Sequence, residues 1–237
     1  MKCNFFNVNF QIDSDFDELL QKVLKKYHTD FENPDLLITI DKNDILFEKE
    51  QDANTINSSD DSAFVLTTLL RKIGENLPSF DAAILHSASF AVNGEGIAFS
   101  ALSGTGKSTH MLKWRDMLGE RFQIINGDKP FVRFIEDKLY IYASPWAGKE
   151  GLRADITVPL KHICQIVRSE TNHTEQMSKQ EGINLLLNQI YMPFDPMARI
   201  KTLQLVNRIA DSVTFWKISC NMDDDAAEVS YKAIFGE

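Results

Sequence analysis

The stretch from Gly96 to Thr109 constrains the fold of this chain more than any other. An apolar run is followed there by a loop with two glycines and then by Lys-Ser-Thr, in the order G-I-A-F-S-A-L-S-G-T-G-K-S-T. Gly104 and Gly106 can adopt backbone angles closed to other residues, and the free N–H groups at the start of a helix attract anions. The pattern therefore predicts a buried strand, a phosphate-binding loop and the first turn of a helix.

Each position of the loop has an expected role. Lys107 is expected to place a positive charge near the transferred phosphate, and the Ser108 hydroxyl is expected to reach Mg²⁺. The full Walker A pattern, G-x-x-x-x-G-K-[ST], has a glycine where this chain has Ala101. A glycine-rich turn that happens to precede Lys-Ser is the alternative. The residues predicted to bind the nucleotide are Ser103, Gly104, Thr105, Gly106, Lys107, Ser108 and Thr109.

A carboxylate is needed beside the phosphates, because the protein must help to hold Mg²⁺. Asp128 is the strongest candidate, since it lies in Asn126-Gly127-Asp128 at the end of the apolar strand predicted for residues 122–125. A strand–loop–helix–strand unit would bring Asp128 back beside the loop. There it would hold Mg²⁺ or take the proton from an attacking hydroxyl. The alternative is an aspartate that merely forms the turn.

Further candidates lie on either side of the loop. His86, predicted to end the strand of residues 82–86, is a candidate for contact with the γ-phosphate or the acceptor, although a single histidine there is more often structural. Lys149 and Arg153, in the loop of residues 144–153, are candidates for a clamp on phosphate or on an acidic acceptor. The equally strong alternative is that these two residues only belong to a charged turn exposed to solvent. His110 is expected on the surface of its helix.

The chain is predicted to comprise a small α+β domain at residues 1–80 and an α/β domain at residues 81–237. In the first, we expect a strand at 5–12, a helix ending near Tyr27, and a hairpin pairing 36–40 with 45–47 around Asp41–Asp44. A loop over 51–61 and a helix over 62–76 follow. Beyond residue 81, strands alternate with helices and hairpins, which predicts a mixed sheet.

Charge and cysteine content exclude several classes of protein. The formal net charge of −9 argues against a general binder of nucleic acid or anionic membranes. Cys3, Cys164 and Cys220 form no C-x-x-C pair and are expected to be buried thiols of a reducing, cytoplasmic environment. No apolar leader and no run long enough to span a membrane occurs in the sequence.

Five segments, taken in order, resemble the HPr kinase/phosphorylase-related kinases. They are L-H-S at 85–87, A-L-S-G-T-G-K-S-T at 101–109, I-N-G-D at 125–128, S-P-W-A-G-K at 144–149 and V-P-L-K-H-I at 158–163. The resemblance covers roughly residues 80 to 237. It implies an α/β fold with a mixed-sheet P-loop core, of the type that these kinases share with phosphoenolpyruvate carboxykinases, next to a small N-terminal α+β unit. It also implies ATP, Mg²⁺ and a serine-type hydroxyl acceptor.

By position, His86 matches the family's histidine before the loop. Lys107 matches the lysine that contacts phosphate, and Ser108 matches the hydroxyl that reaches Mg²⁺. Asp128 matches the family's acidic residue after the second core strand. The chain also departs from the family. Two adjacent aspartates are usual where this chain has Gly127-Asp128-Lys129, and Glu150 with Arg153 do not reproduce the spacing of the E-x-R-G signature. These departures weaken HPr itself as the substrate. A carboxykinase is disfavoured because its large substrate-binding half is missing.

Three functions follow as alternatives. The first is a kinase that transfers the γ-phosphate of ATP to an unknown hydroxyl-bearing acceptor on a peptide, protein or small molecule. The second is an ATP-binding accessory or regulatory module that transfers nothing, and the third is the reverse, phosphorylase reaction. No nucleic-acid or membrane partner is expected, and assembly into a homo-oligomer is left open.

Overall fold

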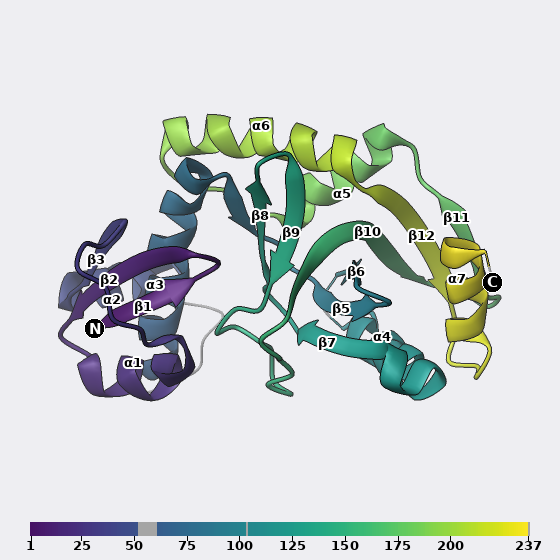
Figure 1. Cartoon of the computed structure of the whole chain (residues 1–237), viewed down its shortest axis with the longest axis horizontal. Coiled ribbons are helices and arrows are strands. Elements are labelled where there is room, and N and C mark those ends of the chain that lie inside the picture. The colour runs from purple at the N-terminus through teal and green to yellow at the C-terminus, as the bar shows by residue number, and fades with distance from the viewer. Residues whose placement is uncertain (52–60, 103, 237) are drawn as a thin grey trace. The chain divides into compact units, whose positions relative to one another are not determined.

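The computed structural model describes residues 1–51, 61–102 and 104–236. The chain divides into two compact units, Met1–Asn76 and Leu77–Glu237, each with its own sheet (Figure 1). No helix within the described ranges is long and apolar enough to cross a membrane.

The first unit contains β1 (Lys2–Phe5), β2 (Val8–Ser14) and β3 (Leu36–Ile40), together with α1 (Asp17–Leu24), α2 (Lys42–Gln51) and α3 (Ser62–Asn76). β1 and β2 form an antiparallel hairpin, and β3 pairs in parallel with β2. The predicted single strand over 5–12 is wrong, because Phe6 and Asn7 adopt positive φ values of 43° and 64° and make a two-residue turn. The helix predicted at 62–76 is confirmed.

The predicted hairpin around Asp41–Asp44 is also wrong, because residues 45–47 belong to α2. The Asp41 carboxylate accepts hydrogen bonds from the backbone N–H groups of Asn43 (2.8 Å) and Asp44 (3.1 Å). In return, the Asp44 carboxylate accepts one from the Asp41 N–H at 3.0 Å. This reciprocal capping starts a helix where the polar residues suggested a turn. Most of the predicted loop at 51–61 lies outside the described residues.

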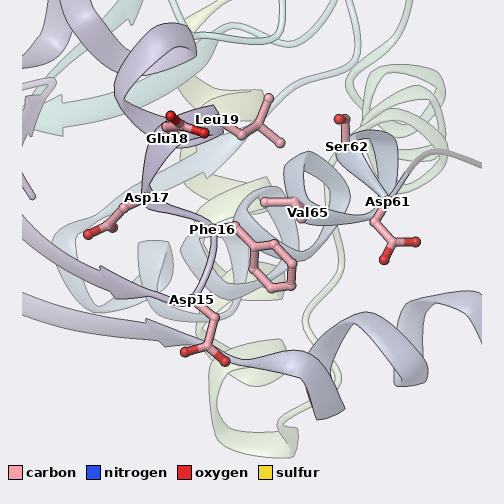
Figure 2. Close-up of a pocket in the computed structure, with 8 residues that line it drawn as sticks. All are labelled: Asp15, Phe16, Asp17, Glu18, Leu19, Asp61, Ser62 and Val65. Atoms are coloured by element: carbon pink, nitrogen blue, oxygen red, sulfur yellow. The ribbon is translucent and has the colours of Figure 1, made fainter.

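The first unit also has a pocket of about 330 Å³ near the starts of α1 and α3 (Figure 2). Its apolar lining comes from Phe16, Leu19 and Val65. Asp15, Asp17, Glu18 and Asp61 surround it with carboxylates, and Ser62 completes the lining.

The second unit is built on a mixed sheet, as predicted. Its strands are β4 (Ala82–Ile84), β5 (Ala88–Val92), β6 (Glu95–Ser100), β7 (Phe122–Asn126), β8 (Phe131–Ile135), β9 (Lys138–Tyr142), β10 (Thr157–Arg168), β11 (His173–Gln176) and β12 (Thr214–Cys220). The strand order is β4-β8-β9-β10-β6-β5-β7, and β12 pairs with both β10 and β11. β6 and β12 run parallel to β10, whereas the other pairs are antiparallel.

β10 connects the two kinds of pairing. Its first residues pair with β9, and its later residues pair with β6 on one side and β12 on the other. The strand predicted at 163–167 is thus the end of a 12-residue strand. β11 was not predicted, because its sequence, H-T-E-Q, is largely exposed and carries no apolar alternation.

Helices cover both faces of this sheet. α5 (Lys179–Gln189) and α6 (Pro196–Ser212) lie together along one side (Figure 1) and share a core with Ala98 and Ile163. α4 (Lys107–Leu118) and α7 (Ala226–Phe235) share a second core with Phe99 and Cys164. Adjacent residues of β6 and β10 therefore face opposite cores, as the period of a strand requires.

We predict that Gly182→Ala destabilises the second unit. A Cβ atom built on Gly182, in α5, would lie 2.3 Å from Cδ2 of the buried Phe215 ring. Alanine favours a helix by about 1 kcal/mol over glycine, but overpacking a core costs about 1–3 kcal/mol. The clash should outweigh the helical gain. Urea unfolding should show a lower free energy of unfolding for this variant, while the exposed control Gln180→Ala should match the wild type.

Candidate functional site

The loop between β6 and α4 contains two glycines with positive φ. Gly104 and Gly106 have φ values of +76° and +120°, in the left-handed region that disfavours other residues. Gly106 precedes α4, and the described side chains provide no cap for its first turn. The N–H groups that open α4 are therefore available to an anion, as a bound phosphate requires. Ser103, predicted to bind the nucleotide, lies outside the described residues.

The predicted lysine and histidine come together beside this loop. Lys107 Nζ donates a hydrogen bond to the Ala101 carbonyl at 3.1 Å and lies 3.5 Å from Nε2 of His86. Burial lowers the pKa of Lys107, and the nearby charge of Asp128 opposes that effect. Of the next two predicted residues, Ser108 is half-buried and Thr109 is exposed.

The predicted carboxylate also reaches this group. Asp128 Oδ1 lies 3.3 Å from His86 Nε2. The backbone joins the same segments, because the Ser87 N–H donates to the Asp128 carbonyl at 2.8 Å. Ser100, the last residue of β6, donates from Oγ to the His86 carbonyl at 3.0 Å. His86 lies between β4 and β5, beyond the end of the strand predicted to contain it.

Asp128 is held by a second partner that the sequence reasoning missed. Lys129 Nζ lies 2.6 Å from Oδ2, so each carboxylate oxygen has a basic neighbour. Burial alone would raise the pKa of Asp128, but hydrogen bonds from His86 and Lys129 and their charges outweigh it and lower the pKa to about 2. Asp128 is therefore an anion throughout the neutral range.

Asn126 and Gly127 shape the turn that presents Asp128, and sequence reasoning gave them no role. The buried Asn126 side chain accepts from the backbone N–H groups of Asp128 (3.0 Å) and Lys129 (2.9 Å) and donates to the Ser144 carbonyl (3.0 Å). A Cβ atom on Gly127 would lie 2.6 Å from the Ala147 carbonyl oxygen. An Asn-Gly pair directly after an apolar strand was the available signal.

The candidate clamp residues do not join this cluster in the same way. The Arg153 guanidinium donates to the Pro145 carbonyl at 3.2 Å, and its backbone pairs with Asn126. Arg153 thus braces its own loop. Lys149 is exposed, and within the described contacts it makes no ion pair with Asp128. The adjacent Gly148 nevertheless approaches the site, since a Cβ atom built there would lie 3.3 Å from Asp128 Cβ.

Arg168, at the end of β10, was not predicted as a site residue. Its guanidinium donates to the carbonyls of Gly104 (2.6 Å) and Thr105 (3.3 Å). These bonds orient two peptide groups of the loop with their carbonyls toward Arg168. Such a contact joins residues far apart in sequence, and nothing in the local pattern around Arg168 indicates it.

His110 is not on the helix surface, as expected from the sequence, but is only 3% exposed. The side of α4 that faces the sheet includes His110, Met111 and Trp114. His110 Nε2 lies 3.0 Å from Ser230 Oγ of α7, and Trp114 Nε1 donates to the same oxygen at 2.9 Å. Burial lowers the pKa of His110 to about 4, so the ring is neutral near pH 7. His110 therefore fastens the helix of the loop to α7.

Comparison with solved structures finds distant likenesses, among them a kinase/phosphatase. The HPr(Ser) kinase/phosphatase from Coxiella burnetii matches with a TM-score of 0.31 and 12% sequence identity, over 52% of this chain and 87% of that one. No family model and no curated protein matches the chain. A likeness of this size carries no argument about chemistry, and the resemblance predicted from the motifs stays a prediction.

We predict that Asp128→Asn lowers the free energy of unfolding at pH 7 by roughly 2 kcal/mol. The carboxyl pKa falls from 3.8 to about 2 on folding, and each pKa unit is worth about 1.4 kcal/mol. Because the folded pKa is the lower one, this contribution is complete above about pH 4 and is lost as the pH falls toward 2.

Urea unfolding at a series of pH values would measure this difference. The gap between the wild type and Asp128→Asn should shrink below about pH 4, where the unfolded carboxyl begins to bind a proton. A gap that stays constant down to pH 3 would show that the charge of Asp128 does not stabilise the fold.

Proposed function

We propose that this chain is an ATP- and Mg²⁺-dependent kinase that transfers the γ-phosphate to a hydroxyl group of a peptide, protein or small molecule. The observation that carries the proposal is the approach of Lys107, His86 and Asp128 to one another at the mouth of a glycine loop that opens a helix. The loop would bind a polyphosphate and the lysine would neutralise its negative charge. The carboxylate would bind the metal ion and the acceptor hydroxyl.

Phosphoryl transfer depends mainly on positioning and on neutralising charge. The uncapped N–H groups of α4 would hold a phosphate, and the peptide groups at Gly104 and Gly106 would approach it closely. Lys107 would neutralise charge on the transferred group. Its bond to the Ala101 carbonyl holds the ammonium group over the loop before any ligand arrives.

The donor set fits a magnesium ion. Carboxylate and hydroxyl oxygens are the hard ligands that Mg²⁺ prefers, and Asp128 is already ionised at neutral pH. Ser108 and Asp128 would hold the ion. When bound, Mg²⁺ would offset the negative charge of the phosphates.

Asp128 would also orient the acceptor hydroxyl. A carboxylate with a pKa of about 2 is a weak proton acceptor, so its main contribution would be to receive a hydrogen bond and direct the hydroxyl oxygen. His86, whose Nε2 lies 3.3 Å from Asp128 Oδ1, would help to orient that carboxylate. In the neutral form with a proton on Nε2, it donates to Asp128.

One observation favours a second function, an ATP-binding accessory module that transfers nothing. Lys129 lies 2.6 Å from Oδ2 of Asp128 and competes for the oxygen that a metal ion would use. A site with a single carboxylate that is already paired could bind a nucleotide and yet transfer phosphate slowly. Product formation, and not binding, separates the two functions.

We expect Lys107→Ala to abolish ATP binding or turnover, because the loop would lose the charge that faces the transferred phosphate. Isothermal titration calorimetry with ATP and Mg²⁺ would measure binding, and ADP release would measure turnover. Lys232→Ala, which removes an exposed lysine of α7, is the matched control and should behave as the wild type. Unchanged affinity and turnover in Lys107→Ala would refute the assignment of the loop.

Asp128→Asn should still bind ATP but should fail to transfer its γ-phosphate, because the neutral amide replaces the charge that faces metal and acceptor. The assay incubates each protein with ATP, Mg²⁺ and a panel of peptides and small hydroxyl compounds, and measures phosphorylated product. Normal transfer by the variant would rule out the catalytic role of Asp128. Binding without product in the wild type would favour the accessory module.

A further inference from the structure

A pocket of about 520 Å³ adjoins the loop, and the proposed phosphate transfer gives it no occupant. Gly104, Thr105 and Gly106 form one side of it, whereas His86 and Asp128 are not among the described residues that line it. The pocket therefore shares residues of the loop but does not include the His86 and Asp128 side chains of the cluster. If the loop holds the phosphates of a ligand, the group attached to those phosphates needs a binding surface nearby.

The pocket lies at the edge of the sheet where three parallel strands end. The loop follows β6, Arg168 ends β10, and Cys220 ends β12. β10 runs parallel to both neighbours, with Arg168 directly opposite Cys220. The carboxyl ends of parallel strands are where ligands of open α/β sheets generally bind, because the chain leaves the strands there in loops.

One face of α4 leads from the loop along the pocket. Gly106, Thr109, His110 and Lys113 line it, and their spacing puts them on one side of the helix. The first turn of this face carries the N–H groups that would hold a phosphate. A group attached to that phosphate would lie against the following turns.

The walls of the pocket combine apolar surface with positive charge. Ile166 and Cys220 are 3% and 9% exposed and form apolar surface, and the exposed Met222 adds a flexible thioether. Arg168 and Lys113 contribute positive charges, and Lys113 Nζ also lies 3.6 Å from Oδ1 of the exposed Asp224. Apolar surface with a few polar groups and a volume of roughly 300–1,000 Å³ is usual for small-molecule sites, and a flat base and a sugar meet such a lining well.

The smaller pocket of the first unit, of about 330 Å³, has the opposite chemistry. The pocket in the first unit has Asp15, Asp17, Glu18 and Asp61 in its lining, and Figure 2 shows these carboxylates around Phe16 and Val65. Carboxylates repel a polyphosphate, whereas Lys113 and Arg168 attract one. Charge therefore favours the pocket beside the loop for a nucleotide.

We infer that the pocket between α4 and the ends of β10 and β12 binds the nucleoside of the triphosphate. The inference rests on the proposed function, since it takes the phosphates to be held at the loop. Arg168 links the two parts of the site, because it lines the pocket and donates to the carbonyls of Gly104 and Thr105. The phosphates then bind on one side of the loop's glycines and the nucleoside on the other.

Photolabelling locates the base directly. The full chain is irradiated with 8-azido-ATP and Mg²⁺, with and without excess ATP, and the modified peptides are identified by mass spectrometry. The inference expects labels within residues 166–169 or 220–222, and their loss in the presence of ATP. Protected labels that lie only elsewhere would overturn it.

A pocket-filling variant provides the second test. Ser169→Trp places a large ring in the pocket at a half-buried position, and Ser212→Trp, at the exposed end of α6, is the control. Calorimetry would compare ATP with inorganic tripolyphosphate. Ser169→Trp should lose about tenfold or more in ATP affinity, as expected when a side chain occupies a binding pocket, and should keep the wild-type affinity for tripolyphosphate. That retained affinity also shows that the variant is folded.

The two proposals fail in different ways. If Ser169→Trp binds ATP as the wild type does while Lys107→Ala loses both ligands, the pocket inference is wrong and the loop assignment stands. If the wild type binds neither ATP nor tripolyphosphate, the proposed function falls and the inference falls with it.

Discussion

The parallel pairing of β10 with β6 on one side and β12 on the other is the constraint on which the rest of the second unit depends. Three carboxyl ends meet at one edge because these strands share a direction. The glycine loop leaves one of them, and Arg168 at the end of another reaches back to the loop carbonyls. Strand direction thus places a basic side chain against a loop far away in sequence.

Charge around the loop is local and runs against the charge of the whole chain. The formal net charge is −9, yet Lys107, Lys129 and Arg168 gather near the loop or its neighbouring turn. Partial burial makes such charges act more strongly than the same charges would in water. An acidic protein can therefore attract a polyphosphate at one place while repelling extended polyanions elsewhere.

The sequence predicted those features that short stretches encode. The strand, loop and helix around Lys107 follow from an apolar run, two glycines and a lysine, and the proximity of Asp128 follows from the order of strands and helices. Asp41 shows where local patterns mislead, because the same residue types start a turn or cap a helix. His110 shows the same limit. His110 is buried and contacts Ser230, a partner that the local sequence cannot indicate.

Long-range contacts account for the other omissions. Arg168 and Lys129 act on the loop and on Asp128 through individual hydrogen bonds whose partners are set by the folded sheet. Lys149, a basic residue beside a glycine, is exposed in the structure, and its role as a clamp stays a prediction. Charged residues follow no periodic pattern of their own. The sequence can therefore suggest charged residues for a site but cannot show which of them reach it.

The shared contact of His110 and Trp114 with Ser230 has a consequence for synthesis of the chain. The three residues form one buried hydrogen-bonded group, yet Ser230 follows His110 by 120 positions. During translation, the helix that opens at the loop emerges long before this partner, so His110 and Trp114 lack their contact with Ser230 until residue 230 has been synthesised. The glycine loop is therefore encoded in the middle of the chain, but the hydrogen bonds that hold its helix to α7 form only after the end of the chain has been made.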